Sequence, residues 1–502
     1  MLDSELARSL AHKLYRADQV RDNEEQAAQQ SGCDMYTLML RAGKCVFEQC
    51  QLHLPNTEQF LVLVGHGNNG GDGYIAACEA KAAGKTVVLC AVEPDRQLQG
   101  DTLRAQQQWL AAGGTIESFS AELINKADVV IDALLGTGTN SLLRSEYEVI
   151  IDALNANTKP VVSIDVPSGL EANTGQSMGR CVQADITVTF VGIKPGLTTG
   201  AGKQSCGQLV FDDLGIGKAF LGLARSSATI IELENFEEMA PRAIHSHKGT
   251  YGRLLCIGGN QGTAGAIRLA GEAALRSGTG LVKVYAHADS KIQINAGRPE
   301  LMVITDSLEQ ALEWATCVVI GPGLGQDDWS QNAFDKTLQY CQAHRKPIVI
   351  DADALNMLSR YSGTFNMSQC VLTPHSGEAA RLLNMTVDEI EADRFNAARQ
   401  LAQRYHATCL LKGAGSIIDN EQHAWVCRHG NPGMATAGMG DVLSGVLGAL
   451  LAQDLNADVA CKYGVCLHAR AGDVLAEEFG QRGLLASDLF DAVRGLINNR
   501  IQ

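Results

Sequence analysis

Residues 61–73 read Leu61-Val62-Leu63-Val64-Gly65-His66-Gly67-Asn68-Asn69-Gly70-Gly71-Asp72-Gly73. The apolar run predicts a buried strand, and the glycine-rich turn after it predicts the entry into a helix near Tyr74. A strand, a G-x-G-x-x-G turn and a helix begin a dinucleotide-binding βαβ unit, because glycines let the backbone approach a pyrophosphate. The polar side chains of this turn could instead coordinate a cation, or Asn69 or Asp72 could cap the helix.

The same alternation of short β-branched runs and longer helical stretches continues along the chain. It predicts further strands at 86–89, 129–131, 161–164 and 187–190 and, after an acidic stretch, at 254–257, 281–284, 318–320, 348–350, 371–372 and 409–411. Such a pattern is typical of α/β folds with parallel sheets, and 502 residues exceed what one core usually holds. We therefore expect an α/β protein of two domains, residues 1–218 and 241–502, joined by a linker region at 219–240.

Composition narrows the classes of protein that fit. A net charge of -15 argues against nucleic acid or an anionic membrane as the main partner, and no run approaches the roughly 18 apolar residues of a spanning helix. The first 30 residues are too acidic for a secretory signal or transit peptide. The 15 cysteines lack metal-site spacing, so we expect reduced core cysteines and a cytoplasmic protein that acts on small molecules.

Two later strands also end in polar, glycine-containing loops. Residues 132–138 read Asp132-Ala133-Leu134-Leu135-Gly136-Thr137-Gly138, and residues 165–170 read Asp165-Val166-Pro167-Ser168-Gly169-Leu170. The carboxyl ends of parallel strands lie along one edge of a sheet, so these loops and residues 65–73 are expected to face one crevice. Their oxygen ligands suit an alkali or alkaline-earth cation, or a buried Asp165 could transfer protons.

Three segments resemble the NAD(P)H-hydrate epimerase family: residues 65–73, residues 163–169 and Ile193-Lys194-Pro195-Gly196-Leu197. The resemblance covers roughly the first 215 residues and implies a Rossmann-like three-layer α/β/α domain acting on NADH or NADPH hydrated at C6. It implies a potassium ion at Asn69, Asp132 and Ser168, and Asp165 as the catalytic group that protonates and deprotonates the C6 oxygen. The substrate-binding residues it implies are Asn68, Asn69, Gly70, Gly71, Asp72, Gly136, Thr137, Gly138, Thr139, Asn140, Ser141, Leu142 and Asp165.

The second half carries Asn431-Pro432-Gly433-Met434-Ala435-Thr436-Ala437-Gly438-Met439-Gly440-Asp441. Small residues before a helix that opens at Gly440 would aim several N–H groups at one spot, an anion hole for a transferring phosphoryl group. An aspartate at that spot disfavours phosphate, so we interpret Asp441 as a general base on a substrate hydroxyl, with a helix-terminal charge as the alternative. No G-x-x-x-x-G-K-[ST] segment is present, which excludes a P-loop enzyme.

This half resembles the ribokinase-like superfamily and, within it, the ADP/ATP-dependent NAD(P)H-hydrate dehydratases. The resemblance rests on residues 247–249, 257–259, 274–278, 321–325, 351–355, 373–378 and 411–413. It implies that Ala266, Gly325, His375 and the catalytic Asp441 contact the hydrated dinucleotide. The nucleotide-binding residues it implies are Lys412, Gly413, Ala414, Gly415, Ser416 and Gly440. Mg²⁺ is expected on the phosphates, and ADP is favoured over ATP because bacterial-type relatives of the fused arrangement use it.

The two resemblances together predict a bifunctional repair enzyme: an epimerase of the R and S hydrates, fused to a dehydratase of the S form. The first alternative is a small-molecule kinase with a nucleotide-sensing N-terminal domain, and the second is an N-terminal half that only binds dinucleotides. A homo-oligomer is expected from relatives of both domains. One departure is Leu40-Arg41, where many relatives carry an acidic residue, and it is expected to alter a local contact or a dimer surface.

Overall fold

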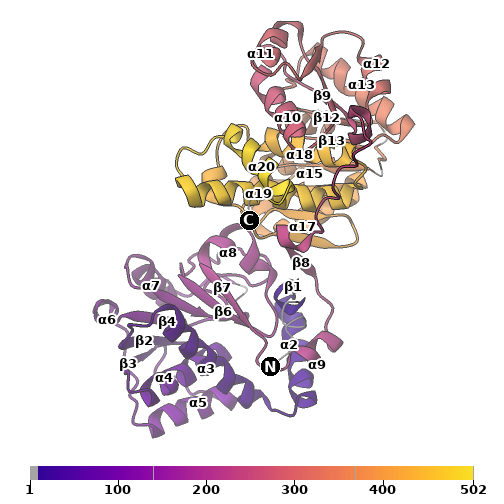
Figure 1. The fold of residues 1–502 in the computed structure, drawn as a ribbon. Coiled ribbons are helices and arrows are strands. Elements are labelled where there is room, and N and C mark those ends of the chain that lie inside the picture. Colours follow the sequence, from indigo (N-terminus) through magenta and orange to yellow (C-terminus); the bar gives the residue numbers. More distant parts are fainter. Residues whose placement is uncertain (1–8, 140, 364, 368, 501–502) are drawn as a thin grey trace. The chain divides into compact units, whose positions relative to one another are not determined.

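The computed structural model describes residues 9–139, 141–363, 365–367 and 369–500. The chain forms two compact units, residues 1–229 and 230–502 (Figure 1). The division falls inside the segment predicted as a linker, and parts of that segment are structured. Helix α9 (Gly217–Leu223) packs with α2 (Ala17–Gln30), and β8 (Ala228–Ile231) begins by pairing with β1 (Lys13–Leu14) in the first unit.

A fully parallel six-stranded sheet forms the centre of the first unit. Its order is β3-β2-β4-β5-β6-β7, so the strand order reverses between β2 and β4. The strands are β2 (Gln59–Val64), β3 (Thr86–Ala91), β4 (Val129–Ala133), β5 (Val161–Ile164), β6 (Ile186–Phe190) and β7 (Gln208–Asp212). Ligands of open α/β sheets bind where the strand order reverses, at the carboxyl ends of the strands.

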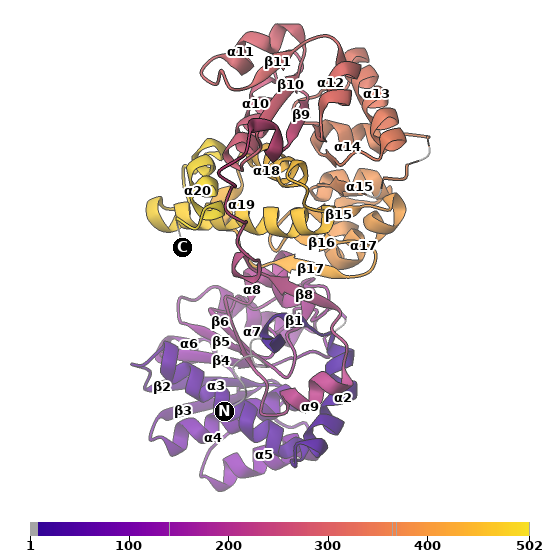
Figure 2. The ribbon, with the colours of Figure 1, turned by 45° about the vertical axis from the view of Figure 1, so that its right-hand side comes forward.

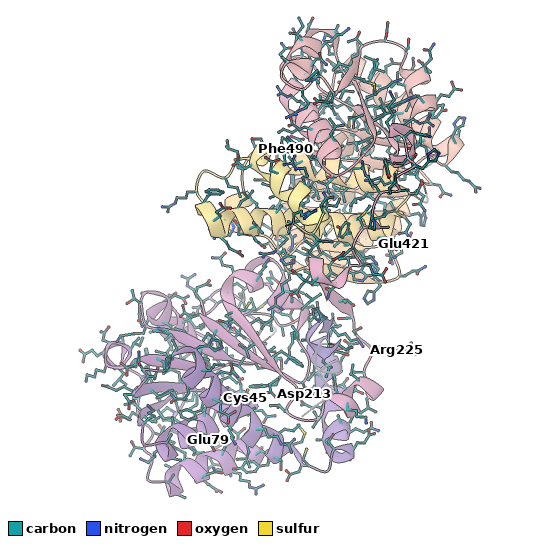
Figure 3. All side chains as sticks on the ribbon, in the orientation of Figure 1. Cys45, Glu79, Asp213, Arg225, Glu421 and Phe490 are labelled. Atoms are coloured by element: carbon teal, nitrogen blue, oxygen red, sulfur yellow. The ribbon has the colours of Figure 1, made fainter. Side chains whose placement is uncertain are left out.

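Alternate residues of these strands face two different helical layers. Val62 and Val64 belong to a core with α3 (Met35–His53), α4 (Asn68–Ala82) and α5 (Gly100–Ala111), whereas Leu61 and Leu63 belong to a core with α6 (Ala121–Lys126) and α7 (Ser145–Asn155). Burial on both faces is why these strands read as continuous apolar runs instead of alternating ones. Side chains fill the layers, among them that of Cys45 in α3 (Figure 3). Cys45 Sγ lies 3.7 Å from Asp212 Oδ2.

The unusual pair Leu40-Arg41 makes a local contact within the first unit. Leu40 packs against the core, and Arg41 Nη1 donates a hydrogen bond to the carbonyl oxygen of Leu214 at 2.6 Å. Helix α8 (Gly200–Ser205) also belongs to this unit.

The second unit is built on a sheet with the order β17-β16-β15-β14-β13-β12-β9-β10-β11. The strands from β9 to β15 run parallel to one another. Strand β16 runs antiparallel to its two neighbours, β15 and β17. They are β9 (Arg253–Ile257), β10 (Leu281–Tyr285), β11 (Met302–Ile304), β12 (Cys317–Ile320), β13 (Ile348–Ile350), β14 (Cys370–Leu372), β15 (Thr408–Leu411), β16 (Ile417–Asp419) and β17 (Ala424–Cys427). The predicted α/β class is confirmed in both units.

Helices cover this sheet on both faces. Leu254 and Cys256 of β9 face a core with α10 (Ala264–Arg276), α18 (Met439–Ala452), α19 (Ala457–Phe479) and α20 (Leu489–Ile497). Figure 2 shows α12 (Leu308–Trp314) and α13 (Asp328–His344) on the other side of the strands from α10. The other helices are α11 (Lys291–Asn295), α14 (Ala352–Leu358), α15 (Ser376–Leu383), α16 (Val387–Ala392) and α17 (Arg394–Tyr405).

Candidate active sites

A cavity of about 610 Å³ lies at the carboxyl ends of the strands of the first sheet. The loops after β2, β4 and β5 line it, at the reversal point of the strand order. The sequence-predicted residues that it brings together are Asn68, Asn69, Asp72, Gly136, Thr137, Gly138, Thr139, Ser141, Leu142 and Asp165. Its size is typical of a small-molecule site.

The glycines of residues 65–73 have a packing role, and the helix after them begins earlier than predicted. Helix α4 begins at Asn68 with Gly67 as its N-cap, so the expected start near Tyr74 was wrong by about two turns. A Cβ on Gly65 would lie 1.9 Å from the oxygen of Leu134, and one on Gly70 would lie 2.2 Å from the oxygen of Gly65. The glycines therefore allow α4 to lie close against β2 and β4.

Two of the predicted substrate residues that the structure describes, Gly70 and Gly71, are not found in the cavity lining. Gly70 packs against Gly65, and a Cβ on Gly71 would meet the side chain of Met39 at 2.5 Å. Asn140 lies outside the described residues. Neither Asn69 nor Asp72 is the helix cap, because that position belongs to Gly67.

Asp165 faces the cavity from an unusual backbone conformation. Its φ is +62°, in the left-handed region that residues other than glycine seldom adopt and that is often found at active sites. Thr189 Oγ1 donates to Asp165 Oδ1 at 3.0 Å, and the Lys194 ammonium donates to the same oxygen. Lys194 is buried and also donates to Thr189 Oγ1 at 3.2 Å and to the Phe190 oxygen at 3.0 Å. One N–H of the ammonium thus holds the Asp165 carboxylate through Oδ1, and the other two hold the ammonium itself in place.

Two further carboxyl groups share this electrostatic environment. Burial raises the pKa of Asp72 well above its usual range, and the carboxylates of Asp165 and Glu24 add to that rise while Lys194 opposes it. Burial raises the pKa of Glu24 to about 7, again against the opposing charge of Lys194. Two groups that hold or exchange protons near neutral pH therefore lie at the same cavity as Asp165.

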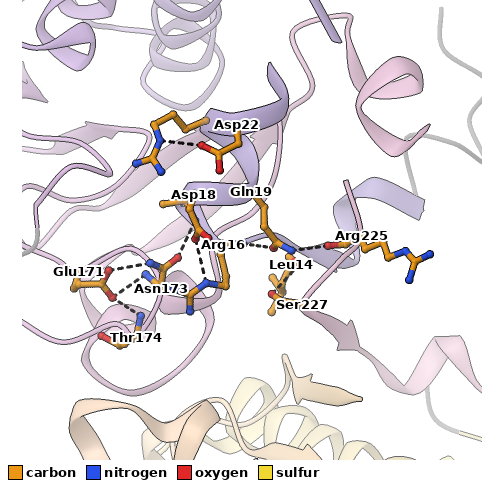
Figure 4. A network of polar contacts seen from close by, with 12 residues as sticks. Leu14, Arg16, Asp18, Gln19, Asp22, Glu171, Asn173, Thr174, Arg225 and Ser227 are labelled. Carbon is orange, nitrogen blue, oxygen red and sulfur yellow. Dashed lines mark hydrogen bonds and ion pairs between the residues drawn. The ribbon is translucent and has the colours of Figure 1, made fainter. Parts of the chain in front are cut away.

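Glu24 reaches the cavity from α2, whose first turn is anchored to the rest of the first unit (Figure 4). Asn173 Oδ1 accepts a hydrogen bond from the backbone N–H of Ala17 at 2.8 Å, and Gln19 Nε2 donates to the oxygen of Arg225 at 2.8 Å. Glu171 in turn accepts from the backbone N–H of Asn173 at 2.9 Å. These contacts fix the start of α2, two turns before Glu24.

Of the three residues implied for potassium, Asn69 lines the cavity, and Asp132 and Ser168 are hydrogen-bonded to each other outside its lining. Asp132 is fully buried and accepts hydrogen bonds from Ser168 Oγ at 2.6 Å and Ser163 Oγ at 2.8 Å. Asn69 Nδ2 donates to the oxygen of Leu135 at 2.9 Å, which leaves its buried Oδ1 without a hydrogen-bond partner among the described residues. A buried carboxylate whose pKa is raised by burial and an unpaired amide oxygen together fit an alkali cation.

In the second unit, the start of α18 meets a buried ion pair. Lys412 Nζ lies 2.7 Å from Asp351 Oδ1, and Ser444 Oγ donates to Asp351 Oδ2 at 2.6 Å. Burial alone would raise the pKa of Asp351, but Lys412 and Ser444 outweigh it and hold that pKa below its usual range. A Cβ on Gly440 would lie 3.4 Å from Lys412 Nζ, so the ammonium stands beside the first turn of α18.

Asp441 projects from the same turn. Burial raises its pKa to about 7, the negative charge of Asp351 adds to that rise, and Lys412 opposes it. Asp353 also raises it and accepts a hydrogen bond from the backbone N–H of Gly325 at 2.8 Å. Asp353 therefore hydrogen-bonds to Gly325 and acts electrostatically on Asp441. The Asp441 carboxyl group is poised to exchange protons near pH 7.

The other predicted residues surround this pair. His375 caps α15 by accepting from the backbone N–H of Gly377 at 2.9 Å, and Glu378 Oε2 accepts from the N–H of His375 at 2.8 Å, forming a capping box. Burial lowers the pKa of His375, so its ring is neutral at pH 7. Ala266 lies in the first turn of α10, which packs against α18. Residues 413–416 form the turn between β15 and β16, beside the ion pair.

Comparison with known proteins supplies the relationship of the whole chain. Residues 35–196 match the family "YjeF-related protein N-terminus", and residues 254–494 match the family "NAD(P)H-hydrate dehydratase". The bifunctional NAD(P)H-hydrate repair enzyme Nnr of Escherichia coli is 45% identical to this chain and covers 98% of it and 95% of the relative. The chain belongs to the family of bifunctional NAD(P)H-hydrate repair enzymes.

This membership in the repair-enzyme family confirms both resemblances found in the sequence. The repair enzyme Nnr of Coxiella burnetii is 40% identical, with 97% of this chain and 99% of the relative covered. A hypothetical protein from Streptococcus mutans of known crystal structure has a TM-score of 0.50 and 30% identity, covering 54% of this chain and 99% of its own. The predicted Rossmann-like and ribokinase-like α/β domains agree with these matches.

Several site residues of this repair-enzyme chain escaped the sequence reasoning. Lys194 stands in a quoted motif, but nothing in its spacing shows that its ammonium meets Asp165. Glu24 precedes the segment matched by the N-terminal family, and only the placement of α2 brings it to the cavity. Asp351 was assigned no role from the sequence. Its position directly after a buried strand was the available signal.

Two general expectations for this family member can also be compared with the structure. No disulfide joins any of the 15 cysteines, which all lie among the described residues, and all except the half-buried Cys33 are buried, as the sequence analysis expected. Within the described residues, no helix is both long enough and apolar enough to span a membrane.

Proposed function

We propose that residues 1–229 interconvert the R and S forms of hydrated NADH and NADPH, and that residues 230–502 dehydrate the S form while ADP becomes AMP and phosphate. The observation that carries this proposal is the presence of two separate acid–base centres, Asp165 with Lys194 and Asp441 with Lys412, in one chain of the repair-enzyme family. The first centre faces a cavity of a size suited to a small molecule, and the second lies at the start of a helix.

The epimerase step needs a group that gives and takes one proton at the C6 oxygen. The ring nitrogen lone pair expels the C6 hydroxyl as water once Asp165 has protonated it, leaving a planar cation to which water returns on either face. Within the described residues, the hydrogen bonds to the Asp165 side chain fall on Oδ1, so Oδ2 is directed to the substrate in this proposal. Lys194 positions the carboxylate, and Glu24, whose pKa is raised by burial to about 7, can exchange protons nearby.

Potassium is proposed to bind at Asn69 Oδ1, Asp132 and Ser168. The unpaired Asn69 oxygen and the buried Asp132 carboxylate support this assignment. Such an ion would offset the buried negative charge and hold the loop after β4 against the start of α4, next to the cavity.

The dehydratase step begins with removal of a proton from the C6 hydroxyl by Asp441. The hydroxyl oxygen bonds to the β-phosphorus of ADP, and the bond from that phosphorus to the AMP oxygen breaks. The C6–O bond then breaks as phosphate leaves, and loss of a proton from C5 restores the dihydropyridine of NADH. Lys412 places a positive charge beside the phosphoryl group, and the first turn of α18 offers backbone N–H groups to it.

Mg²⁺ is proposed to enter with the nucleotide, because this ion is usually held by substrate phosphates, waters and one or two carboxylates. Asp351, Asp353 and Asp441 interact electrostatically at this place and supply the acidic side chains. The ion would neutralise phosphate charge during transfer. The absence of disulfides among the described cysteines fits the further proposal of a reducing, cytoplasmic location.

The test uses the whole chain with a mixture of R and S hydrates, K⁺, Mg²⁺ and either ADP or ATP. Absorbance of the reduced nicotinamide and released phosphate are followed together. Recovery of the whole mixture with matching phosphate supports both activities and identifies the nucleotide. Recovery of the S fraction alone contradicts the epimerase assignment, and phosphate retained on the product without recovered absorbance favours a small-molecule kinase.

A further inference from the structure

A charged group outside the two acid–base centres lies just after β3. Glu93 Oε2 accepts from Arg96 Nη1 at 2.8 Å, and Glu93 Oε1 accepts from Arg144 Nη1 at 2.9 Å. His66 Nδ1 lies 3.5 Å from Glu93 Oε2 and 3.3 Å from Tyr147 Oη. Burial, with Arg96 adding to it, lowers the pKa of His66, so its ring is neutral at pH 7. Two guanidinium groups thus face one carboxylate, and the group carries a net positive charge.

This group is continuous with the proposed epimerase cavity. His66, Tyr147 and Arg144 line that cavity, and His66 and Tyr147 also line a small neighbouring hollow with Glu93 and Arg96. His66 belongs to the loop after β2, between Gly65 and the N-cap of α4. Arg144 precedes the first residue of α7. The group therefore extends the cavity toward β3, away from Asp165.

The order of strands gives this position a chemical meaning. Along the sheet edge, Asp165 follows β5, the start of α4 follows β2, and Glu93 follows β3. From β5 to β3 there are three strand spacings, about 14 Å in all. A dinucleotide with its nicotinamide at Asp165 and its pyrophosphate at the α4 N-terminus reaches its adenosine ribose at Glu93. In dinucleotide-binding sheets an acidic residue at this place binds the ribose 2′-hydroxyl, and a nearby arginine accommodates a 2′-phosphate.

We propose that Glu93, Arg96 and Arg144 form the adenosine-ribose subsite of the epimerase half, which accepts the 2′-hydroxyl of hydrated NADH or the 2′-phosphate of hydrated NADPH. This inference rests on the proposed function and deepens it. With NADH hydrate, Glu93 accepts from the ribose hydroxyl while the arginines hold it in place. With NADPH hydrate, both guanidinium groups turn their N–H donors from Glu93 to the phosphate.

The kinetic test compares epimerisation of NADH hydrate and NADPH hydrate by the whole chain carrying Arg96→Ala and Arg144→Ala together. Loss of two partly exposed, charged hydrogen bonds is expected to raise KM for NADPH hydrate roughly 10- to 100-fold, with kcat retained. KM for NADH hydrate is expected to change less than about threefold. Equal effects on the two hydrates would overturn the proposal.

A matched control is Arg180→Ala. Arg180 is as exposed as Arg144, at 55% against 56%, and forms an ion pair with Asp152 at 2.8 Å, but it is absent from the cavity lining. It is expected to leave both KM values unchanged. Glu93→Gln is expected to raise KM for NADH hydrate and to lower it for NADPH hydrate, since the carboxylate repels phosphate. The opposite ranking would contradict the assignment of Glu93.

A binding measurement separates this subsite from the proposed catalysis. Calorimetric titration of the whole chain with adenosine 2′,5′-bisphosphate and with AMP is carried out in saturating ADP and Mg²⁺, for wild type and the double variant. Tighter binding of the bisphosphate by wild type, lost in the double variant, supports the subsite even if neither hydrate is epimerised. Equal preference in the two proteins overturns it even if both hydrates are.

Discussion

Lys194→Met isolates the contribution of the buried ammonium to the epimerase centre. Lys194 is 1% exposed and serves three acceptors, Asp165 Oδ1, Thr189 Oγ1 and the Phe190 oxygen. Removing the ammonium leaves Asp165, whose side chain is 18% exposed at the cavity, without its charged partner, which costs about 1.5–3 kcal/mol. For a unit of this size the unfolding midpoint should fall by roughly 3–12 °C. The charge-assisted bond to Asp165 contributes about 1.5–3 kcal/mol to its orientation, so epimerisation should slow about 10- to 150-fold.

The assay separates R and S hydrates by liquid chromatography, so it does not depend on the dehydratase half. Lys126→Met is the matched control, because Lys126 is exposed at the end of α6. It should change neither the rate nor the unfolding midpoint. Lys194→Arg, which keeps the charge, should recover part of the stability. A folded Lys194→Met protein that epimerises within about threefold of wild type would refute the positioning role of Lys194.

Three further predictions concern the ion site and the second unit. Replacing K⁺ by tetramethylammonium should slow epimerisation. Asp132→Asn should raise the half-saturating K⁺ concentration by about tenfold or more, because the buried ligand loses its charge. An epimerisation rate that does not depend on K⁺ would contradict the ion site. Asp441→Asn should lower dehydration by roughly 10²- to 10⁴-fold with epimerisation unchanged, and wild-type dehydration should rise as the pH passes through about 7, where Asp441 becomes the ionised base; a rate that falls over that range contradicts the base assignment. Asp351→Asn should destabilise the second unit by about 1.5–3 kcal/mol at pH 7, since Lys412 loses its partner at 2.7 Å and keeps only Glu378 at 3.9 Å. The pKa of Asp351 is depressed, so this difference in unfolding free energy is present above about pH 4 and shrinks as the pH falls below it, which urea titrations at pH 7 and pH 3 would measure; a difference that grows in acid is the contrary result.

Much of the fold was accessible from local sequence because parallel strands buried on both faces leave continuous apolar runs. The strands at 61–64, 161–164 and 348–350 were found for this reason. Strand β7 was missed because it lies near the sheet edge with partly exposed residues. Strands β16 and β17 were missed because they pair antiparallel through a short turn, without the intervening helix that marks the strands of βαβ units.

The candidate sites divide in the same way between local and long-range information. Asp165 and Asp441 stand directly at strand and helix ends, where sheet topology alone predicts exposure to a ligand. The ion pair of each site joins residues that are distant in the sequence. Lys194 is 29 residues beyond Asp165, and Lys412 is 61 residues beyond Asp351. An ion pair of that separation leaves no periodic signal, so it becomes visible only when the chain is folded.

The close seating of α4 changes what a G-x-G-x-x-G match means. In this chain Gly65 and Gly70 of the motif are needed because a Cβ would strike Leu134 or Gly65, whereas a Cβ on Gly67 would meet nothing within 4 Å. Two of the three motif glycines are thus explained by the packing of α4 against the strands, whatever ligand is bound. Under the subsite proposed above, the preference for one nicotinamide cofactor would come from side chains beyond the glycines, such as Arg96 and Arg144.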